Sequence, residues 1–325
     1  MLCSLGTALL DEFRWLDDGL ESSRPCEVRF GGGGTYAAIG ARVWSRDVGL
    51  LVDRGPDFPP AVQRQLDSFG PMWYYTDTPT PTPRALNVFR PPSSTREFSY
   101  LAPHPARHLS DLAMITSPDK LSYLHLCCPP SSLAVLLPSL ARLSPAPQLI
   151  YEPIPFACNP AQLPQLVALL PHVRVFSPND DEAAALLGVH GPASASGASI
   201  EVEELAQRFR DLGARDVVVR AGERGAFVLP EMALEGSWVP AFHSSADEVK
   251  DTVGAGNAFL GGLMAALALS HGVAHAARYG AVSAGIVVES VGLPVHTTSE
   301  REGEELWNGR SARARLEEMD RKKER

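Results

Sequence analysis

The sequence predicts an α/β fold in which a central, mainly parallel sheet lies between layers of helices. A chain of 325 residues that is 45% hydrophobic and 21% charged can bury one large core. Short apolar runs alternate with helix-length stretches along most of the chain, which is typical of strand–helix units around a parallel sheet. The composition is also ordinary for a globular protein, which excludes a disordered, collagen-like or disulfide-stapled chain.

The expected elements follow from the length and periodicity of the apolar runs. The runs of strand length are Leu2–Leu5, Val48–Val52, Ser122–Leu126, Gln148–Tyr151, Val173–Phe176 and Val217–Arg220. The stretches with helical periodicity are Thr35–Ser45, Pro60–Phe69, Leu133–Leu143, Pro160–Leu170, Glu182–Leu187, Val202–Leu212 and Asn257–Ser270.

Three segments depart from this alternation. Eight prolines between residues 71 and 105 forbid a continuous helix or a central strand there, so we expect a surface excursion with edge strands at Arg84–Phe89 and Arg96–Tyr100. Residues 191–199 are rich in Gly, Ala and Ser and predict a loop. The charged residues 300–325 predict a solvated helix or a frayed end.

Charge and cysteine content limit the partners and the compartment. A net charge of -9 gives no global positive field, so neither nucleic acid nor an anionic membrane is an expected partner. The cysteines are odd in number and form no CxxC pair, which indicates reduced thiols, no zinc site and a cytoplasmic protein. They are Cys3, Cys26, Cys127, Cys128 and Cys158. The N-terminus lacks a basic leader, and residues 252–277, although uncharged, contain glycines and polar residues that favour a buried helix over a membrane span.

The clearest chemical motif is Asp251-Thr-Val-Gly-Ala-Gly-Asn257, which precedes an apolar helical run. Small residues at the start of a helix leave backbone N–H groups uncovered at its positive end, where they can hold an anion. The candidate groups are those of Gly254, Ala255, Gly256 and Asn257. A glycine-rich turn that only permits close helix packing would have the same sequence, and the spacing alone does not separate the two interpretations.

Several motifs, in chain order, resemble those of the ribokinase-like or PfkB-type carbohydrate kinases. They are Gly6-Thr-Ala-Leu-Leu-Asp11, Gly31-Gly-Gly-Gly-Thr-Tyr-Ala-Ala38, Ser177-Pro-Asn-Asp-Asp-Glu182, Val217-Val-Val-Arg-Ala-Gly-Glu-Arg-Gly-Ala226, the 251–257 string, and the stretch Ala281 to Pro294. The resemblance spans roughly residues 1–295. It implies a ribokinase-like three-layer domain over residues 1–298, a small β lid from about 13–30 and 71–100, and a charged tail at 299–325.

The resemblance also implies ATP and Mg²⁺ as cofactors, a sugar or nucleoside as substrate, and a homodimer through the lid. By the resemblance, the substrate would contact Asp11, Gly31, Gly32 and Tyr36. The nucleotide would contact Asn179, Glu182, Gly222, Gly225 and Thr252, with magnesium held through water by Asn179 and Glu182. The transferred phosphoryl group would face Gly254, Ala255, Gly256 and Asn257.

Two positions depart from the family pattern. Asn257 stands where the family has a proton-accepting aspartate, and Tyr36 replaces the usual asparagine of the diglycine motif. Together with Glu152-Pro-Ile-Pro155, these changes resemble a fungal branch of the family, the "maintenance of killer" type. An amide orients a hydroxyl but cannot take its proton, and losing a general base costs about two to four powers of ten in rate. A slow kinase and a nucleotide-binding protein without turnover both remain as hypotheses, because phosphoryl transfer depends mainly on positioning and charge neutralisation.

Other interpretations of the same residues stay open. Gly32-x-Gly34-x-x-Ala37, followed by Asp53 at the end of a strand, has the layout of a dinucleotide-binding oxidoreductase. Asn179 and Glu182 could simply begin a helix. Asp251 could replace the missing base or could order its own loop.

Overall fold

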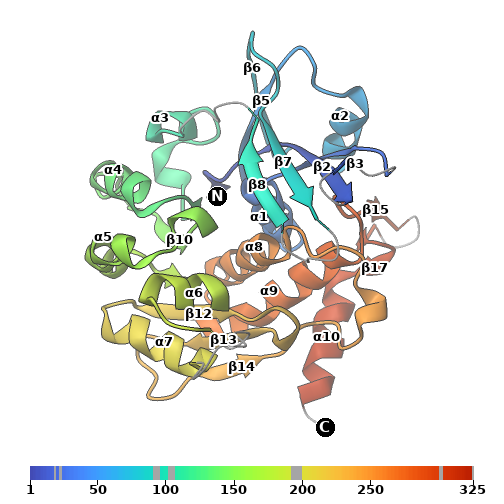
Figure 1. The fold of residues 1–325 in the computed structure, drawn as a ribbon. Helices are drawn as coiled ribbons and strands as arrows, with labels where there is room; N and C mark the ends of the chain where they lie inside the picture. The colour runs from blue at the N-terminus through green and yellow to red at the C-terminus, as the bar shows by residue number, and fades with distance from the viewer. Residues whose placement is uncertain are drawn as a thin grey trace.

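The computed structural model describes residues 1–17, 20–21, 24–90, 96–101, 107–191, 200–299 and 303–323. Figure 1 shows helices packed around a central sheet, with a smaller group of strands at one end of that sheet. This arrangement confirms the predicted α/β fold with a mainly parallel sheet.

The main sheet runs through the whole molecule. Its described strands, in spatial order, are β14 (Ser237–Val239), β13 (Ala226–Leu229), β12 (Asp216–Arg220), β11 (Val175–Phe176), β10 (Gln148–Glu152), β9 (Tyr123–Cys127), β1 (Leu2–Ser4), β5 (Val48–Arg54) and β6 (Trp73–Asp77). From β12 to β6 every neighbouring pair is parallel, while β13 and β14 are antiparallel. All six predicted strands lie in this sheet, because continuous apolar runs are what a sheet buried on both faces requires.

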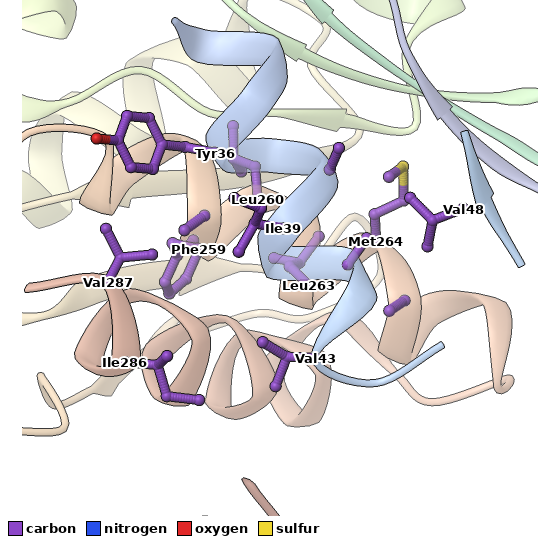
Figure 2. Close-up of a cluster of buried hydrophobic side chains, with 14 of the residues drawn as sticks. Tyr36, Ile39, Val43, Val48, Phe259, Leu260, Leu263, Met264, Ile286 and Val287 are labelled. Carbon is purple, nitrogen blue, oxygen red and sulfur yellow. The ribbon is translucent and has the colours of Figure 1, made fainter. Parts of the chain in front are cut away.

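Helices cover both faces of the sheet. One apolar cluster packs against α1 (Gly33–Arg42), α8 (Ala255–Ala268) and α9 (Val273–Val288). Figure 2 shows Ile39 of α1, Val43 directly after α1, Leu263 of α8 and Ile286 of α9 facing one another in it. The other cluster packs against α3 (Leu109–Leu112), α4 (Pro130–Leu140), α5 (Leu163–Leu169), α6 (Asp180–Leu187) and α7 (Val202–Asp211).

A second, smaller sheet corresponds to the expected lid, and we refer to it by that name. Its described strands are β2 (Leu9–Asp17), β3 (Leu20–Glu21), β4 (Glu27–Gly31), β7 (Arg84–Phe89) and β8 (Arg96–Tyr100). The predicted lid segments therefore need correction at both ends. The lid begins at Leu9, and β6, within the expected 71–100 segment, pairs with β5 and extends the main sheet instead. The helix α2 (Pro60–Asp67) connects β5 to β6.

The charged C-terminal segment folds back onto the domain. It contains β15 (His296–Thr298), β16 (Glu305–Trp307), β17 (Arg310–Ser311) and α10 (Ala312–Lys323). The expectation of a solvated or frayed end does not hold for the described part, because Trp307 and Met319 are buried and Arg315 is fully buried. The Arg315 guanidinium pairs with Glu289 at the end of α9, which explains how so charged a helix can pack.

The uncharged stretch 252–277 is divided between α8 and the first turn of α9. Among the residues that the structure describes, no helix has both the length and the apolar character needed to cross a bilayer.

Candidate active site

The candidate site lies where the parallel strands end. Polar or thiol side chains end most of these strands, and those of the strands nearest the site are Ser4 on β1, Cys127 on β9, Glu152 on β10 and Arg220 on β12. In open parallel sheets, ligands bind at this carboxyl edge. The first turn of α8 reaches the same edge, since Asn257 contacts Glu152 there.

The first turn of α8 meets the requirement for an anion site. Gly254 precedes the helix in the left-handed conformation (φ 80°), and no side chain caps the helix. The N–H of Ala255 donates to the Thr252 carbonyl at 3.2 Å, which removes that group from the predicted set. The helical series begins with Ala258, whose N–H donates to the Gly254 carbonyl at 2.9 Å. The N–H groups that precede this bond, above all those of Gly256 and Asn257, are the ones a helix leaves for external acceptors.

Tyr36 explains why residue 254 is glycine. A Cβ built on Gly254 would lie 2.1 Å from the Tyr36 ring. Figure 2 shows that ring at the edge of the apolar cluster, with its hydroxyl pointing away from the other side chains. Burial raises the pKa of the Tyr36 hydroxyl, and the charges of Asp11 and Asp251 raise it further, so it stays protonated at neutral pH. The Tyr36 ring therefore packs against the turn before α8 and leaves no room for a side chain at residue 254.

Asn257 joins a buried chain of hydrogen bonds. Its Nδ2 donates to Glu152 Oε1 at 2.5 Å. The same oxygen lies 2.8 Å from His125 Nε2, and His125 Nδ1 lies 2.9 Å from Ser4 Oγ. Because Glu152 is a carboxylate, it fixes which side of the Asn257 amide faces it.

Ser4, His125 and Glu152 form a hydrogen-bonded series whose residue types are those of a catalytic triad: a hydroxyl nucleophile, a histidine base and an acid. All three side chains are buried, at 2%, 0% and 2% exposure. The Ser4 hydroxyl also accepts the Gly6 N–H at 3.0 Å. No substrate can reach Ser4 in this arrangement, so the chain serves to hold Glu152 and Asn257.

The charge of Glu152 is maintained despite its burial. Burial alone would raise its pKa, but the Arg220 guanidinium and the hydrogen bonds from His125 and Asn257 hold that pKa below its usual range. Arg220 Nη2 lies 3.1 Å from Glu152 Oε2. Both carboxylate oxygens of Glu152 are therefore engaged, which leaves it a positioning group for Asn257.

The Asn179 and Glu182 side chains each accept a hydrogen bond from the backbone N–H of the other residue. Asn179 Oδ1 accepts the Glu182 N–H at 2.7 Å, and Glu182 Oε2 accepts the Asn179 N–H at 2.8 Å, a reciprocal capping box at the start of α6. Glu182 Oε2 also lies 3.3 Å from Arg220 Nη2. Burial raises the pKa of Glu182 to about 7, against the lowering effect of Arg220.

Direct coordination of magnesium by Asn179 and Glu182 fits poorly. Magnesium prefers carboxylates that keep their full charge and have free oxygen lone pairs. Here Glu182 Oε2 already contacts the Arg220 guanidinium and the Asn179 N–H, and Asn179 Oδ1 accepts a hydrogen bond in the helix cap. Within the described residues, no group of three or more His, Cys, Asp or Glu side chains is arranged to hold a metal.

The predicted substrate residues converge on the start of α1. Asp11 Oδ2 lies 2.6 Å from where a Cβ on Gly31 would be, and the same position lies 3.3 Å from the Tyr36 ring. Asn87, on the lid strand β7, donates from Nδ2 to Asp11 Oδ1 at 2.9 Å. Gly32 takes a positive φ of 95°, which turns the chain into α1. Asp11, Gly31, Gly32 and Tyr36 are thus brought together as expected.

The substrate turn and the anion site touch. A Cβ built on Gly33 would lie 3.1 Å from Asn257 Nδ2 and 3.4 Å from Cys127 Sγ. The start of α1 and the first turn of α8 are therefore adjacent. Tyr100 at the end of β8 is exposed, and the Cys127 and Asp11 charges add to the partial burial that raises the pKa of its hydroxyl.

The remaining predicted residues lie on the loops around Arg220 and α8. Gly222 and Gly225 frame the turn after β12, and both have positive φ. A Cβ on Gly222 would meet no atom within 4 Å, so this side of the turn is open. Thr252 is exposed in the loop before α8. In that loop, Asp251 accepts from Arg29 Nη1 at 2.9 Å and from the Val253 N–H at 3.0 Å, which orders the loop and ties it to the lid.

The dinucleotide-binding layout is not formed. That layout requires the glycine string to follow a strand of the parallel sheet. Here Gly32 and Gly34 follow β4, which pairs with β2 in the lid. Asp53, the expected ribose ligand, is buried and paired with Arg107 at 2.9 Å.

Four residues of the site were not assigned a site role from the sequence: His125, Glu152, Arg220 and Asn87. His125 and Arg220 each interrupt or end an apolar strand, and a polar residue at the carboxyl end of a buried strand is the signal that could have identified them. Asn87 lies in the lid, where alternating exposure gives no such signal.

Comparison with known proteins agrees with this geometry. Residues 75–298 match the pfkB family of carbohydrate kinases. An uncharacterized protein of Schizosaccharomyces pombe is 31% identical over 96% of this chain and 91% of its own length. Protein MAK32 of Saccharomyces cerevisiae is 29% identical over 86% of this chain and 82% of its own.

Among solved structures, a ribokinase from Cryptococcus neoformans in complex with ADP superposes with a TM-score of 0.69. It is 24% identical and covers 98% of both chains, so it establishes the ribokinase-like fold. The resemblance inferred from the ordered motifs is confirmed. The uncapped α8 turn, the diglycine entry to α1 and the match over most of the chain lead to one conclusion: this chain belongs to the pfkB family of carbohydrate kinases.

Proposed function

We propose that this protein binds ATP and transfers its terminal phosphoryl group, slowly, to a hydroxyl of a sugar, nucleoside or similar small alcohol. The contact between the diglycine turn and Asn257 carries the proposal. It supports a reaction in which an alcohol bound at Asp11 meets an anion held at the first turn of α8. Family membership supports the same reaction class.

In this proposal each group has a physical role. The N–H groups of Gly256 and Asn257 hold the phosphoryl oxygens. The open side of the turn at Gly222 leaves room for the nucleotide, while Gly225 packs the turn against the Val239 backbone. Asp11 orients the alcohol by accepting from its hydroxyls. Asn257 donates to Glu152 and turns its Oδ1 toward the attacking hydroxyl, whose proton finally passes to solvent or to the phosphate. Because direct coordination of magnesium by Asn179 and Glu182 fits poorly, no step is assigned to magnesium.

A second candidate function is nucleotide binding without turnover, in the cytoplasm. The Asn257–Glu152 hydrogen bond favours it, because the residue that faces the acceptor hydroxyl is an amide held by a buried carboxylate. The two functions share one pocket and differ only in the chemical step.

Calorimetric titration with ATP and ADP, followed by an assay of ADP release with a panel of sugars, nucleosides and polyols, tests both functions. Asp11→Asn removes the substrate carboxylate and should abolish alcohol-dependent ADP release while ATP still binds. Glu12→Gln is the matched control, since Glu12 alternates to the other face of β2 and pairs with Arg84. Absence of ATP and ADP binding would overturn both functions. Binding without ADP release for any alcohol would leave the second alone.

A further inference from the structure

Arg220 lies between three parts of the candidate site: the first turn of α8, Glu152 at the end of β10, and Glu182 in the capping box of α6. Arg220 ends β12, and its Nη1 would lie 2.1 Å from a Cβ built on Gly256, so the guanidinium lies against the first turn of α8. Its Nη2 donates to the Ser177 carbonyl at 3.0 Å and lies 3.1 Å from Glu152 and 3.3 Å from Glu182. These contacts fix the orientation of a side chain that is only 12% exposed.

Around Arg220, an N–H donor has no hydrogen-bond acceptor among the described residues. The start of a helix carries partial positive charge, and a guanidinium carries a full one, so the two repel when they are adjacent. Both groups donate hydrogen bonds and neither accepts, so neither can satisfy the other. In addition, Arg220 Nε is buried and has no hydrogen-bond partner among the described residues.

The nearby carboxylates do not supply this acceptor. Glu152 already accepts from Asn257 and contacts His125 through Oε1, and its Oε2 lies 3.1 Å from Arg220 Nη2. Glu182 Oε2 is shared between Arg220 Nη2 and the Asn179 N–H. A phosphoryl group differs, because it brings three acceptor oxygens and negative charge, and the planar arginine fork matches that geometry.

We propose that Arg220 binds the terminal phosphate of the nucleotide together with the first turn of α8, and that it supplies the positive charge which magnesium at Asn179 and Glu182 would otherwise supply. This inference rests on the proposed function and makes it more specific. It implies that nucleotide affinity depends little on magnesium, and that loss of Arg220 makes the affinity magnesium-dependent.

The test is isothermal titration of the full chain with ATP, and with inorganic tripolyphosphate, in Mg²⁺ and in EDTA. For the unaltered protein we expect the two affinities for ATP to agree within about threefold. In Arg220→Gln we expect affinity in EDTA to fall by about ten- to a hundredfold, the range for a lost charge-assisted hydrogen bond, with partial recovery in Mg²⁺. Tripolyphosphate should show the same loss, because it carries the phosphates without the base.

Two further variants separate the role of Arg220 from general damage to the fold. Arg174→Gln is the matched control: it breaks an arginine pair with the buried Asp216, 2.9 Å apart, at the opposite end of β12, and should leave both affinities unchanged. Gly256→Ala keeps every charge but pushes the Arg220 guanidinium from the α8 turn, and should weaken binding in EDTA as Arg220→Gln does. If Arg220→Gln does not fold, Gly256→Ala decides alone.

The outcomes distinguish this inference from the proposed function. Binding of ATP that requires Mg²⁺ in the unaltered protein would overturn the role of Arg220 and leave the proposed function standing. The role of Arg220 is equally overturned if the Arg220 and Gly256 variants bind ATP in EDTA as tightly as the unaltered protein does. Failure of ATP to bind in either buffer would overturn both.

Discussion

Restoring an aspartate at position 257 should not by itself restore a catalytic base. Asn257 Nδ2 lies 2.5 Å from Glu152 Oε1, so Asn257→Asp replaces a hydrogen-bond donor with a second carboxylate at the same place. Two unit charges about 4 Å apart interact by about 4 kcal/mol at an effective dielectric constant of about 20. The pair avoids this repulsion by sharing one proton, which raises the pKa of one carboxyl by about 3 units. This figure is an upper value, because Arg220 stabilises negative charge on Glu152.

The consequence depends on pH in a defined direction. A carboxyl whose pKa is higher in the folded state than in the unfolded state, about 4, destabilises the protein as pH rises between those two values. We expect Asn257→Asp to lose about 1 kcal/mol of unfolding free energy at pH 5 and about 4 kcal/mol at pH 8, measured by urea unfolding against the unaltered protein.

The rate of ADP release provides the second measurement. At neutral pH the shared proton blocks the new aspartate, so Asn257→Asp alone should give no gain. Glu152→Gln with Asn257→Asp removes the repulsion and lets the glutamine amide donate to the aspartate, and should raise the rate by about a hundredfold or more. If Asn257→Asp alone gains as much as the double variant and is equally stable at pH 5 and pH 8, the reasoning about the Glu152 contact is wrong.

Three further predictions follow from buried polar contacts. Asn87→Leu removes the donor to Asp11 and also a buried Oδ1 that has no partner among the described residues. The unfolding free energy should therefore change by less than about 1 kcal/mol. The rise in Tm caused by an acceptor alcohol should disappear in thermal-shift assays. Arg315→Met removes the buried arginine from Glu289, which keeps His243 and Asn308 as partners, and should cost about 3 kcal/mol in urea unfolding, the lower end for a broken buried pair. The hydrogen bond to Glu289 raises the pKa of His243, so the stability lost in His243→Gln should be largest below about pH 6.5 and vanish as pH rises through the raised pKa.

Matched measurements make these outcomes decisive. Arg310→Met breaks an exposed pair with Glu318 at 2.8 Å and should cost less than about 1 kcal/mol, so an equal effect of the Arg315 and Arg310 variants would contradict the argument from burial. For Asn87, an alcohol-induced Tm shift that survives the substitution would remove Asn87 from the substrate site. For His243, a loss of stability that stays constant from pH 5 to pH 9 would show that the Glu289 contact does not depend on protonation.

Local sequence was enough to locate most elements of the main sheet and its helices. The apolar run Val217–Arg220 lies within β12, and the uncharged stretch from Asn257 lies within α8, because burial on both faces demands continuous apolar residues. Some helix ends differ from the predicted ones by a few residues, because capping hydrogen bonds determine where a helix begins. The 180–187 helix begins two residues earlier than expected, because Asn179 and Glu182 cap each other.

Long-range pairing decided what the sequence could not. The residues of the proline-rich segment did not indicate that β6 would pair with β5. Strand pairing depends on the neighbouring strand as well as on the residues of the strand itself. The C-terminal segment was expected to be a solvated helix or a frayed end because it is dense in charges of both signs. It packs because Trp307 and Met319 find an apolar neighbour and Arg315 finds Glu289.

For the site, the sequence by itself determined the residue types: small residues before α8, a carboxylate at Asp11, and an amide at Asn257. Only the tertiary structure decided what those groups face. Glu152, His125 and Arg220 come from three different strands and meet Asn257 because parallel strands bring their carboxyl ends to one edge. Hydrophobic periodicity is a local property, whereas the charge next to a catalytic position depends on which strands become neighbours.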